Sequence, residues 1–231
     1  MQINQWESLS VLDLWKQQVL LHHGETYKGI PIVKFPQDLW TYEKIIGDYK
    51  PEIIIELGVD NGGFTRWLYD RMLLLQLESS TGPRTVIGID YRLDAPRKNL
   101  SSIVNHKEKH DVSIMLLNCN LASGQISQTA TKLKDICKGK RVMIIEDSAH
   151  NYQTTKSCIT NLANLVPVGG WWITEDTCVD FESLRQNKNW PRGALTATEE
   201  LLGQSSQWEL SKINHQYVLT CHPNGFYRRI G

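Results

Sequence analysis

The chain has 231 residues, of which 41% are hydrophobic, so it can bury a full core, most simply as a single domain. Lys plus Arg and Asp plus Glu both number 25, and this zero net charge lacks the basic excess expected of a nucleic-acid-binding protein. We find no polybasic block, signal-peptide pattern or apolar run of about 18 residues, and therefore expect a cytoplasmic protein without a membrane partner.

The first fifty residues are predicted to form a helical cap ahead of the main domain. Residues 8–23 place apolar side chains at helical spacing, and residues 36–46 form a second predicted helix that opens with proline. We therefore expect residues 1–50 to form an N-terminal cap or lid, and residues 51–231 to form one compact domain. The apolar first helix would also allow association into a homo-oligomer.

From residue 51 onward, short β-branched runs alternate with amphipathic segments. Five strands are predicted, at residues 52–57, 85–90, 112–117, 141–146 and 170–174. Helices are predicted between them, at residues 62–77, from the end of the second strand to about 109, at 126–137 and at 152–165. This alternation predicts an α/β fold in which a parallel sheet is covered by helices on both faces.

The last part of the chain differs in character. Residues 208–213 and 217–221 flank Asn214-His215-Gln216 and predict an antiparallel hairpin. Together, these elements predict a Rossmann-like, doubly wound, mostly parallel seven-stranded sheet with a C-terminal antiparallel hairpin. The five cysteines have no zinc-site spacing, and we expect them to be small buried thiols rather than catalytic or metal-binding groups.

The first predicted strand runs into a glycine-rich turn, Glu56-Leu57-Gly58-Val59-Asp60-Asn61-Gly62-Gly63. Glycine permits a tight turn and the close approach of a ligand to the following helix. Asp90 ends the next strand, where an acidic side chain can accept hydrogen bonds from both ribose hydroxyls of a nucleoside. The dinucleotide fingerprint is absent, and Asp60 would repel a pyrophosphate. A cationic cofactor without phosphate, such as S-adenosylmethionine, suits this turn; a turn without a ligand is the alternative.

Two acidic segments each end a predicted strand, Glu146-Asp147 the fourth and Glu175-Asp176 the fifth. If these strands are parallel neighbours, their carboxyl ends lie about 5 Å apart and Asp147, Glu175 and Asp176 converge. His150 would lie one helical turn away. Crowded carboxylates repel one another unless a cation holds them, and all-oxygen ligation favours Mg²⁺ over zinc. The alternative is that Asp147 caps the following helix while the second acidic pair caps a loop.

These residues resemble those of class I S-adenosylmethionine-dependent methyltransferases, and more narrowly the cephalosporin hydroxylase/rhamnosyl O-methyltransferase family. The resemblance covers roughly residues 25–230. It includes Ile55-Glu56-Leu57-Gly58 with Gly62-Gly63, Ile89-Asp90, Asp147 with His150, Glu175-Asp176-Thr177, and the segments 27–31, 34–40 and 223–229. The order and spacing of these pieces make the resemblance specific.

The acidic residues are also similar to those of metal-dependent macrolide-sugar O-methyltransferases. That resemblance implies that Asp147, Glu175 and Asp176 hold Mg²⁺ and that His150 is the general base. It also implies a cofactor site that contains Glu56, Gly58, Gly63 and Asp90, to which the acidic turn adds Asp60. The chain departs from many relatives at Asp60 and Phe64, in the stretch that faces the methionine tail of the cofactor.

The expected function is Mg²⁺-dependent O-methylation of a small molecule, in the tailoring of a natural product. Sugar, polyketide or peptide hydroxyls and carboxylate-like oxygens all fit as acceptors. In the hypothesised mechanism Mg²⁺ lowers the pKa of the acceptor hydroxyl, His150 takes the proton, and the oxygen attacks the sulfonium methyl group. Two alternatives remain, an iron- and 2-oxoglutarate-dependent hydroxylase and a non-catalytic protein that binds S-adenosylmethionine.

The segment after the fifth strand is expected to form the acceptor pocket, because substrate-binding loops on such sheets follow the strands. This segment carries Arg185, Lys188, Trp190 and Arg192. Substrate choice is expected there and in residues 1–35. Lys28 and Lys34 belong to the second region, where contact with the cofactor carboxylate and exposure to solvent are both open.

Overall fold

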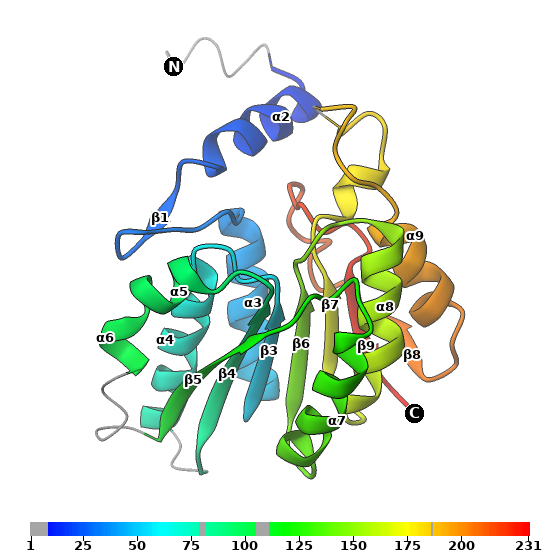
Figure 1. Cartoon of the computed structure of the whole chain (residues 1–231). Coiled ribbons are helices and arrows are strands. Elements are labelled where there is room, and N and C mark those ends of the chain that lie inside the picture. Colours follow the sequence, from blue (N-terminus) through cyan, green and yellow to red (C-terminus); the bar gives the residue numbers. More distant parts are fainter. Residues whose placement is uncertain (1–8, 79–81, 105–110, 186) are drawn as a thin grey trace.

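A seven-stranded sheet with the order β5-β4-β3-β6-β7-β9-β8 runs through the middle of the computed structural model, which describes residues 9–78, 82–104, 111–185 and 187–231 (Figure 1). Its strands are β3 (Ile53–Leu57), β4 (Arg84–Asp90), β5 (Val112–Asn118), β6 (Val142–Glu146), β7 (Trp171–Thr174), β8 (Trp208–Leu210) and β9 (Phe226–Arg229). Strands β3 to β7 are parallel, whereas β9 is antiparallel to both of its neighbours. The predicted fold class is confirmed.

Helices cover both faces of this sheet (Figure 1). One face packs against α3 (Pro36–Tyr49) and α4 (Gly63–Glu78), and the other against α7 (Gln125–Cys137) and α8 (Tyr152–Leu162). Successive residues of β3 serve the two faces in turn, because Ile53 and Ile55 join the core under α7 and α8 while Ile54 joins the core under α3 and α4. Burial on both faces explains why the strands are continuous apolar runs.

The remaining elements lie at the ends and edges of the sheet. They are α2 (Val11–His22), β1 (Thr26–Tyr27), β2 (Ile30–Pro31), α5 (Asp94–Asn99), α6 (Ser101–Val104), η1 (Ala163–Leu165), η2 (Thr177–Asp180), α9 (Ala194–Thr198) and the π-helix η3 (Glu199–Gly203). Helix α2 begins with a capping box between Ser10 and Asp13, and it lies beyond the carboxyl edge of the sheet (Figure 1). Among the described residues, every helix is too short or too polar to cross a bilayer.

The N-terminal region contacts the rest of the chain in two ways. Helix α3 contributes Tyr42, Ile45 and Ile46 to the core on one face of the sheet. Helix α2 instead packs Trp15 and Val19 into a smaller cluster with Cys178, Val179 and Cys221. The two helices predicted in this region are thus present, but only α2 stands apart from the sheet.

Two predicted elements differ from the structure. The helix predicted to reach about residue 109 is split into α5 and α6, and residues 105–110 lie outside the described part of the chain. The predicted hairpin is wrong in its second strand, because residues 217–221 form a loop and β9 lies at 226–229. The buried Asp38 carboxylate explains this loop, since it accepts hydrogen bonds from the Thr220 hydroxyl (2.5 Å) and the Cys221 N–H (2.9 Å).

We expect Asp38→Ala to lower the free energy of unfolding by about 1–3 kcal/mol, because it leaves the buried Cys221 N–H without its acceptor. Urea unfolding followed by tryptophan fluorescence measures this change. Asp48→Ala, an exposed site on the same helix, is the matched control and should stay within about 0.5 kcal/mol of the parent. Equal stability of both variants would contradict the role assigned to Asp38.

Candidate active site

The acidic residues predicted to converge leave the sheet at the same level. Strands β6 and β7 are parallel neighbours with Glu146 opposite Thr174, and the Glu175 N–H donates to the Glu146 carbonyl oxygen (2.9 Å). Gly58, just after β3, packs against the backbone of Asp147, because a Cβ atom at Gly58 would lie 2.0 Å from the Asp147 carbonyl oxygen. Its φ of 93° also requires glycine. The glycine-rich turn and the acidic residues therefore share one edge of the sheet.

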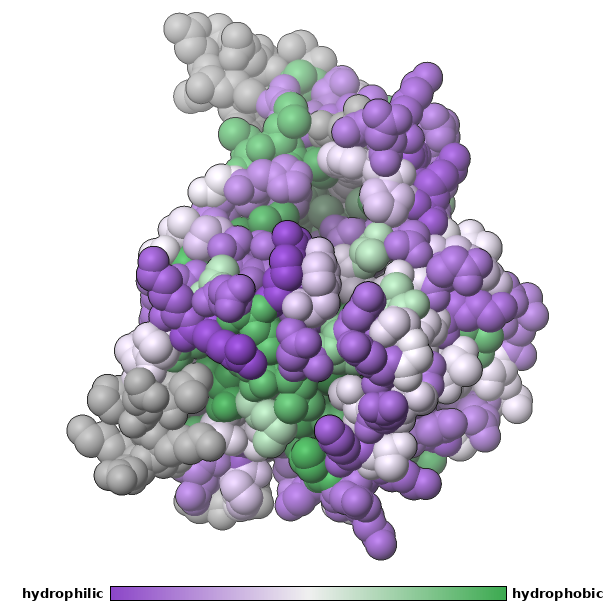
Figure 2. All heavy atoms as spheres, viewed as in Figure 1, coloured by the Kyte–Doolittle hydropathy of each residue, from purple (hydrophilic) through white to green (hydrophobic). Residues whose placement is uncertain are grey.

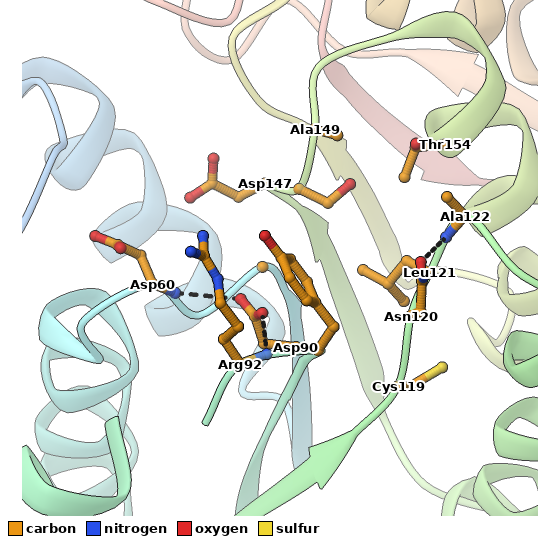
Figure 3. A pocket seen from close by; sticks show the side chains of 13 residues that line it. Asp60, Asp90, Arg92, Cys119, Asn120, Leu121, Ala122, Asp147, Ala149 and Thr154 are labelled. Carbon is orange, nitrogen blue, oxygen red and sulfur yellow. Dashed lines mark hydrogen bonds between the residues drawn. The ribbon is translucent and has the colours of Figure 1, made fainter. Parts of the chain in front are cut away.

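A cavity of about 490 Å³ opens beside the glycine-rich turn (Figure 3). It is lined by Gly58, Asp60, Asp90, Tyr91, Arg92, Cys119, Asn120, Leu121, Ala122, Asp147, Ser148, Ala149 and Thr154. Asp90 organises the turn, because its carboxylate accepts the N–H groups of Val59 (2.9 Å) and Arg92 (2.9 Å). Figure 3 shows Asp60 and Arg92 on one side of the cavity, Asn120, Leu121 and Ala122 on the other, and Asp147 above. The volume of the cavity lies in the range of small-molecule sites.

The predicted cofactor residues divide into two groups. Gly58, Asp60 and Asp90 line this cavity, whereas Glu56 and Gly63 do not. Glu56 is 1% exposed and accepts a hydrogen bond from the Thr65 hydroxyl, and burial raises its pKa well above the usual range. Gly63 lies under the N-terminal segment, since a Cβ atom there would meet the Pro31 carbonyl oxygen at 2.0 Å. Glu56 and Gly63 therefore pack next to the glycine-rich turn without lining the cavity.

The predicted base lies between two of the predicted metal ligands. His150 Nε2 is 3.5 Å from Asp176 Oδ2 and 3.8 Å from Asp147 Oδ1. Ligand atoms of these three residues all lie within 4.8 Å of one another. Both His150 (φ 50°) and Asp176 (φ 51°) adopt left-handed backbone conformations, which direct them into this cluster at a cost in strain.

An ammonium group also enters the acidic cluster. Lys34 Nζ lies 2.6 Å from Asp147 Oδ2 and 2.9 Å from Glu175 Oε2, and its side chain is 5% exposed. Glu175 is 1% exposed, and its other oxygen accepts a hydrogen bond from the Tyr42 hydroxyl (2.5 Å). Glu175 thus joins the cluster through Lys34 and Tyr42. Lys28 lies elsewhere, in an ion pair with Asp70 (2.7 Å).

A second histidine, His222, contacts the acidic residues on the side away from the cavities. The buried His222 accepts the Asp176 N–H at Nδ1 (2.8 Å), and its Nε2 lies 3.6 Å from Asp38 and 3.9 Å from Glu175. Because Nδ1 accepts a hydrogen bond, the ring proton is on Nε2, facing the two carboxylates. His222 and Tyr42 were not predicted from the sequence, since neither follows a strand nor belongs to a recognisable motif.

Burial and the nearby charges shift the pKa values of Asp147, His150 and Asp176. Burial, reinforced by Glu175, raises the pKa of Asp147 to about 7 although Lys34 and His150 act in the opposite direction. Burial would lower the pKa of His150, but Asp176 and Asp147 outweigh it and hold the pKa above its usual value. Burial would raise the pKa of Asp176, but His150 and His222 hold it below its usual range. Without a further cation, Asp147 is therefore partly protonated near pH 7, whereas Asp176 is ionised.

The donor set fits a hard divalent cation. Carboxylate oxygens dominate, and the Lys34 ammonium supplies one positive charge beside three carboxylates. The capping alternative is wrong for Asp147, because the N-cap of α8 is Asn151, whose side chain accepts the Thr154 N–H (3.0 Å). Within the described residues, the other group of possible ligands is Asp176 with Cys178 and Cys221, and neither group contains two histidines. All five cysteines are buried and free, as predicted.

A second cavity, of about 400 Å³, opens on the other side of the acidic cluster. It is lined by Trp15, Val19, His22, His23, Val33, Lys34, Asp60, Asp147, Ser148, His150, Asp176, Cys178, Val179, Trp190, Pro191 and Cys221. Asp60, Asp147 and Ser148 line both cavities. The walls come from the two regions predicted to form an acceptor pocket, residues 1–35 and the segment around Trp190. Arg185 instead holds that segment together, donating to the carbonyl oxygens of Val179, Lys188 and Trp190.

Comparison with known proteins gives a consistent group of relatives. The family model described as Rhamnosyl O-methyltransferase/CmcI matches residues 20–230. The rhamnosyl O-methyltransferase of Mycobacterium tuberculosis (strain ATCC 25618 / H37Rv) is 22% identical over 216 residues, which cover 93% of this chain and 82% of the relative. The rhamnosyl O-methyltransferase of Mycobacterium leprae (strain TN) is 23% identical over 167 residues, covering 71% of this chain and 65% of the relative.

Solved structures of CmcI show the same fold. The apo-structure of CmcI-N160 has a TM-score of 0.62 and 18% identity, and covers 100% of this chain and 85% of that chain. The structure described as cmcI-D160 Mg-SAM has the same TM-score, identity and coverage. At this level of identity the likeness establishes the architecture, and the chemistry of the present site must be argued from its own residues.

Proposed function

The chain belongs to the rhamnosyl O-methyltransferase/CmcI family of S-adenosylmethionine-dependent O-methyltransferases, and we propose that it methylates a small-molecule hydroxyl with the help of Mg²⁺. One observation carries this proposal: two cavities meet at Asp147 and Ser148, with the acidic cluster and His150 at their junction. A methyl donor on one side and an acceptor on the other would face each other there. The structure described as cmcI-D160 Mg-SAM supports the choice of both cofactors.

We assign S-adenosylmethionine to the first cavity, where it supplies the sulfonium methyl group. Asp90 lies at the end of β4 and can accept hydrogen bonds from ribose hydroxyls, while Tyr91 offers a ring beside the base. Asp60 and Asp147 place negative charge at the end of the cavity that faces the acceptor, which suits the positive sulfonium. This assignment places Gly58, Asp60 and Asp90 in contact with the cofactor and keeps Glu56 and Gly63 in supporting positions.

We assign Mg²⁺ to the acidic cluster of Asp147, Glu175 and Asp176, where it supplies positive charge that lowers the pKa of an acceptor hydroxyl. His150 is the proton acceptor, because its Nε2 faces the junction between the cavities and its ring is held by Asp147 and Asp176. With Mg²⁺ bound, Lys34 would make the cluster neutral, because the three negative charges of the carboxylates equal the sum of one ammonium charge and two metal charges. Of the N-terminal region, helix α2 serves as a lid in this proposal, because its Trp15 and Val19 wall the acceptor cavity.

The decisive experiment measures methyl transfer from labelled S-adenosylmethionine to a panel of hydroxylated small molecules, with metal, with EDTA, and after Mg²⁺ is restored. We expect turnover to disappear with EDTA and to return with Mg²⁺. Turnover that survives chelation would remove the metal from the mechanism. A demand for Fe²⁺ and 2-oxoglutarate would favour the hydroxylase alternative, and calorimetric cofactor binding without any Mg²⁺-linked binding would favour a non-catalytic protein.

We expect Lys34→Met to strengthen Mg²⁺ binding by about tenfold or more, because the ammonium would repel a divalent cation held by the same carboxylates and occupies oxygens of Asp147 and Glu175. The same change should lower the melting temperature in EDTA, because Asp147 and Glu175 lose the buried ammonium group that is paired with both of them. Calorimetric titration with Mg²⁺ and thermal unfolding measure the two effects. Lys28→Met, at a half-exposed ion pair with Asp70, is the control. Weaker Mg²⁺ binding would mean that Lys34 is needed to hold the ligands in place.

A further inference from the structure

The second cavity lies beneath α2, where the surface is hollowed (Figure 2). Its floor is the acidic cluster, and its walls are α2 and the segment from η2 to Pro191. A volume of about 400 Å³ is at the small end of the range for ligand pockets, so it holds one ring system and its substituent.

The charge of this cavity is negative. Of the residues that line it, Asp60, Asp147 and Asp176 are acidic and only Lys34 is basic. The Lys34 ammonium is already shared between Asp147 and Glu175, which adds a fourth carboxylate behind the wall. A divalent cation in the cluster would still leave one negative charge when Asp60 is counted. Among the described lining residues, Lys34 is the one lysine or arginine, and its ammonium group is already paired with carboxylates.

Three histidines also line the cavity: His22, His23 and His150. In the proposed function His150 is the base and is neutral when it accepts the proton of the acceptor. His22 is buried, and burial together with His23 lowers its pKa, so its ring is neutral at pH 7. His22 Nδ1 also lies 2.7 Å from the Val19 carbonyl oxygen, which keeps its donor within the helix. The Arg185 guanidinium, in the same loop as Trp190, donates to backbone carbonyl oxygens and does not line the cavity.

The walls above the acidic floor are mainly carbon and sulfur. Trp15 and Val19 face the cavity from α2, and Val179 and Trp190 face it from the opposite segment, next to two buried cysteines. The Trp15 indole N–H is used by the Thr220 carbonyl oxygen (3.1 Å), so its ring offers the ligand only an apolar surface. A polyhydroxylated body would lose its hydrogen bonds to water against such walls.

We propose that the acceptor is an uncharged or cationic molecule in which an apolar body is attached to the reacting hydroxyl group. This inference rests on the proposed function and narrows it, because it rejects acceptors whose body carries a carboxylate or a phosphate. The apolar body lies between α2 and the Trp190 segment, and the hydroxyl lies at the acidic floor beside His150.

The test uses three catechols that share one reacting end and differ only in the charge of the side chain. They are 4-propylcatechol, 3-(3,4-dihydroxyphenyl)propylamine in its ammonium form, and 3-(3,4-dihydroxyphenyl)propionate. Dissociation constants are measured by tryptophan fluorescence on the protein with S-adenosylhomocysteine and Mg²⁺, and initial methylation rates are compared. We expect the neutral and ammonium compounds to bind at least about tenfold more tightly than the carboxylate, as one unfavourable charge contact of about 1.4 kcal/mol requires.

A charge added to the wall should reverse this order. Val33 is half-buried at the cavity, and Val33→Lys is expected to strengthen binding of the carboxylate about tenfold and to weaken binding of the ammonium compound. Val218→Lys, at an exposed valine that does not line the cavity, should leave all three constants unchanged. If Val33→Lys does not fold, the comparison of the three ligands on the unaltered protein still decides the question.

The outcomes separate this inference from the proposed function. Calorimetry with S-adenosylhomocysteine and Mg²⁺, without any acceptor, tests the cofactor and metal sites alone. If both bind but the carboxylate binds as tightly as 4-propylcatechol, or none of the three catechols binds, the acceptor class is wrong while the methyltransferase assignment stands. If S-adenosylhomocysteine does not bind, the proposed function fails first.

Discussion

Asp176→Asn is expected to reduce methyl transfer by at least about 10³-fold, which corresponds to roughly 4 kcal/mol of transition-state stabilisation. The substitution preserves the shape of the side chain but removes one of three charges that hold the divalent cation, and it leaves His150 without the carboxylate nearest to its Nε2 (3.5 Å). Calorimetric titration should show Mg²⁺ binding weakened by at least about tenfold. S-adenosylhomocysteine affinity should hardly change, because Asp176 does not line the first cavity.

The matched control for this variant is Glu182→Gln, which removes an exposed acidic group six residues further along the same segment. It should keep both turnover and Mg²⁺ affinity. Asp176 has a side chain that is 34% exposed, so its replacement is not expected to unfold the protein, and a thermal melt verifies this. Normal Mg²⁺ affinity in a folded Asp176→Asn protein would exclude the residue as a metal ligand and favour its interpretation as a loop residue.

His150→Ala is expected to lower kcat by about 10²-fold or more, since a positioned general base contributes that much to proton transfer. Affinity for S-adenosylhomocysteine should stay the same because His150 lines the second cavity and not the first. His215→Ala, at an exposed histidine remote from the cluster in sequence, is the control and should retain full turnover. A near-normal kcat in His150→Ala would mean that His150 is not the base and that solvent or the acceptor itself takes up the proton.

The pH dependence provides a second readout for His150. A general base must be neutral to accept a proton, and Asp176 and Asp147 overcome the effect of burial to hold the pKa of His150 above its usual value. The rate should therefore rise with pH as His150 loses its proton, and it should be lower on the acidic side. This rise should be absent from the residual activity of His150→Ala. A profile with the same shape in both proteins would show that another group controls the rate.

Much of the fold was readable from local patterns. Ile53–Leu57 and Val142–Glu146 are short apolar runs because both of their faces are buried, and such runs between amphipathic helices are typical of a parallel sheet. The convergence of Asp147 and Glu175 followed from the same reasoning, because parallel neighbours end at one edge of a sheet. The second strand of the predicted C-terminal hairpin was wrong, because apolar alternation at 217–221 does not reveal that Asp38 holds this segment in a loop. The antiparallel partner of β8 is β9, at Phe226–Arg229.

The sequence by itself determined the order of strands and helices and the acidic character of one sheet edge, since both depend on neighbours a few residues apart. Only the tertiary structure decided what surrounds that edge. Lys34 reaches Asp147 across 113 positions of the chain, and Thr220 reaches Asp38 across 182, so no local periodicity could indicate either contact. The physical reason is that a buried charge is stabilised by whichever partner the fold brings within about 3–4 Å, however distant that partner is in sequence.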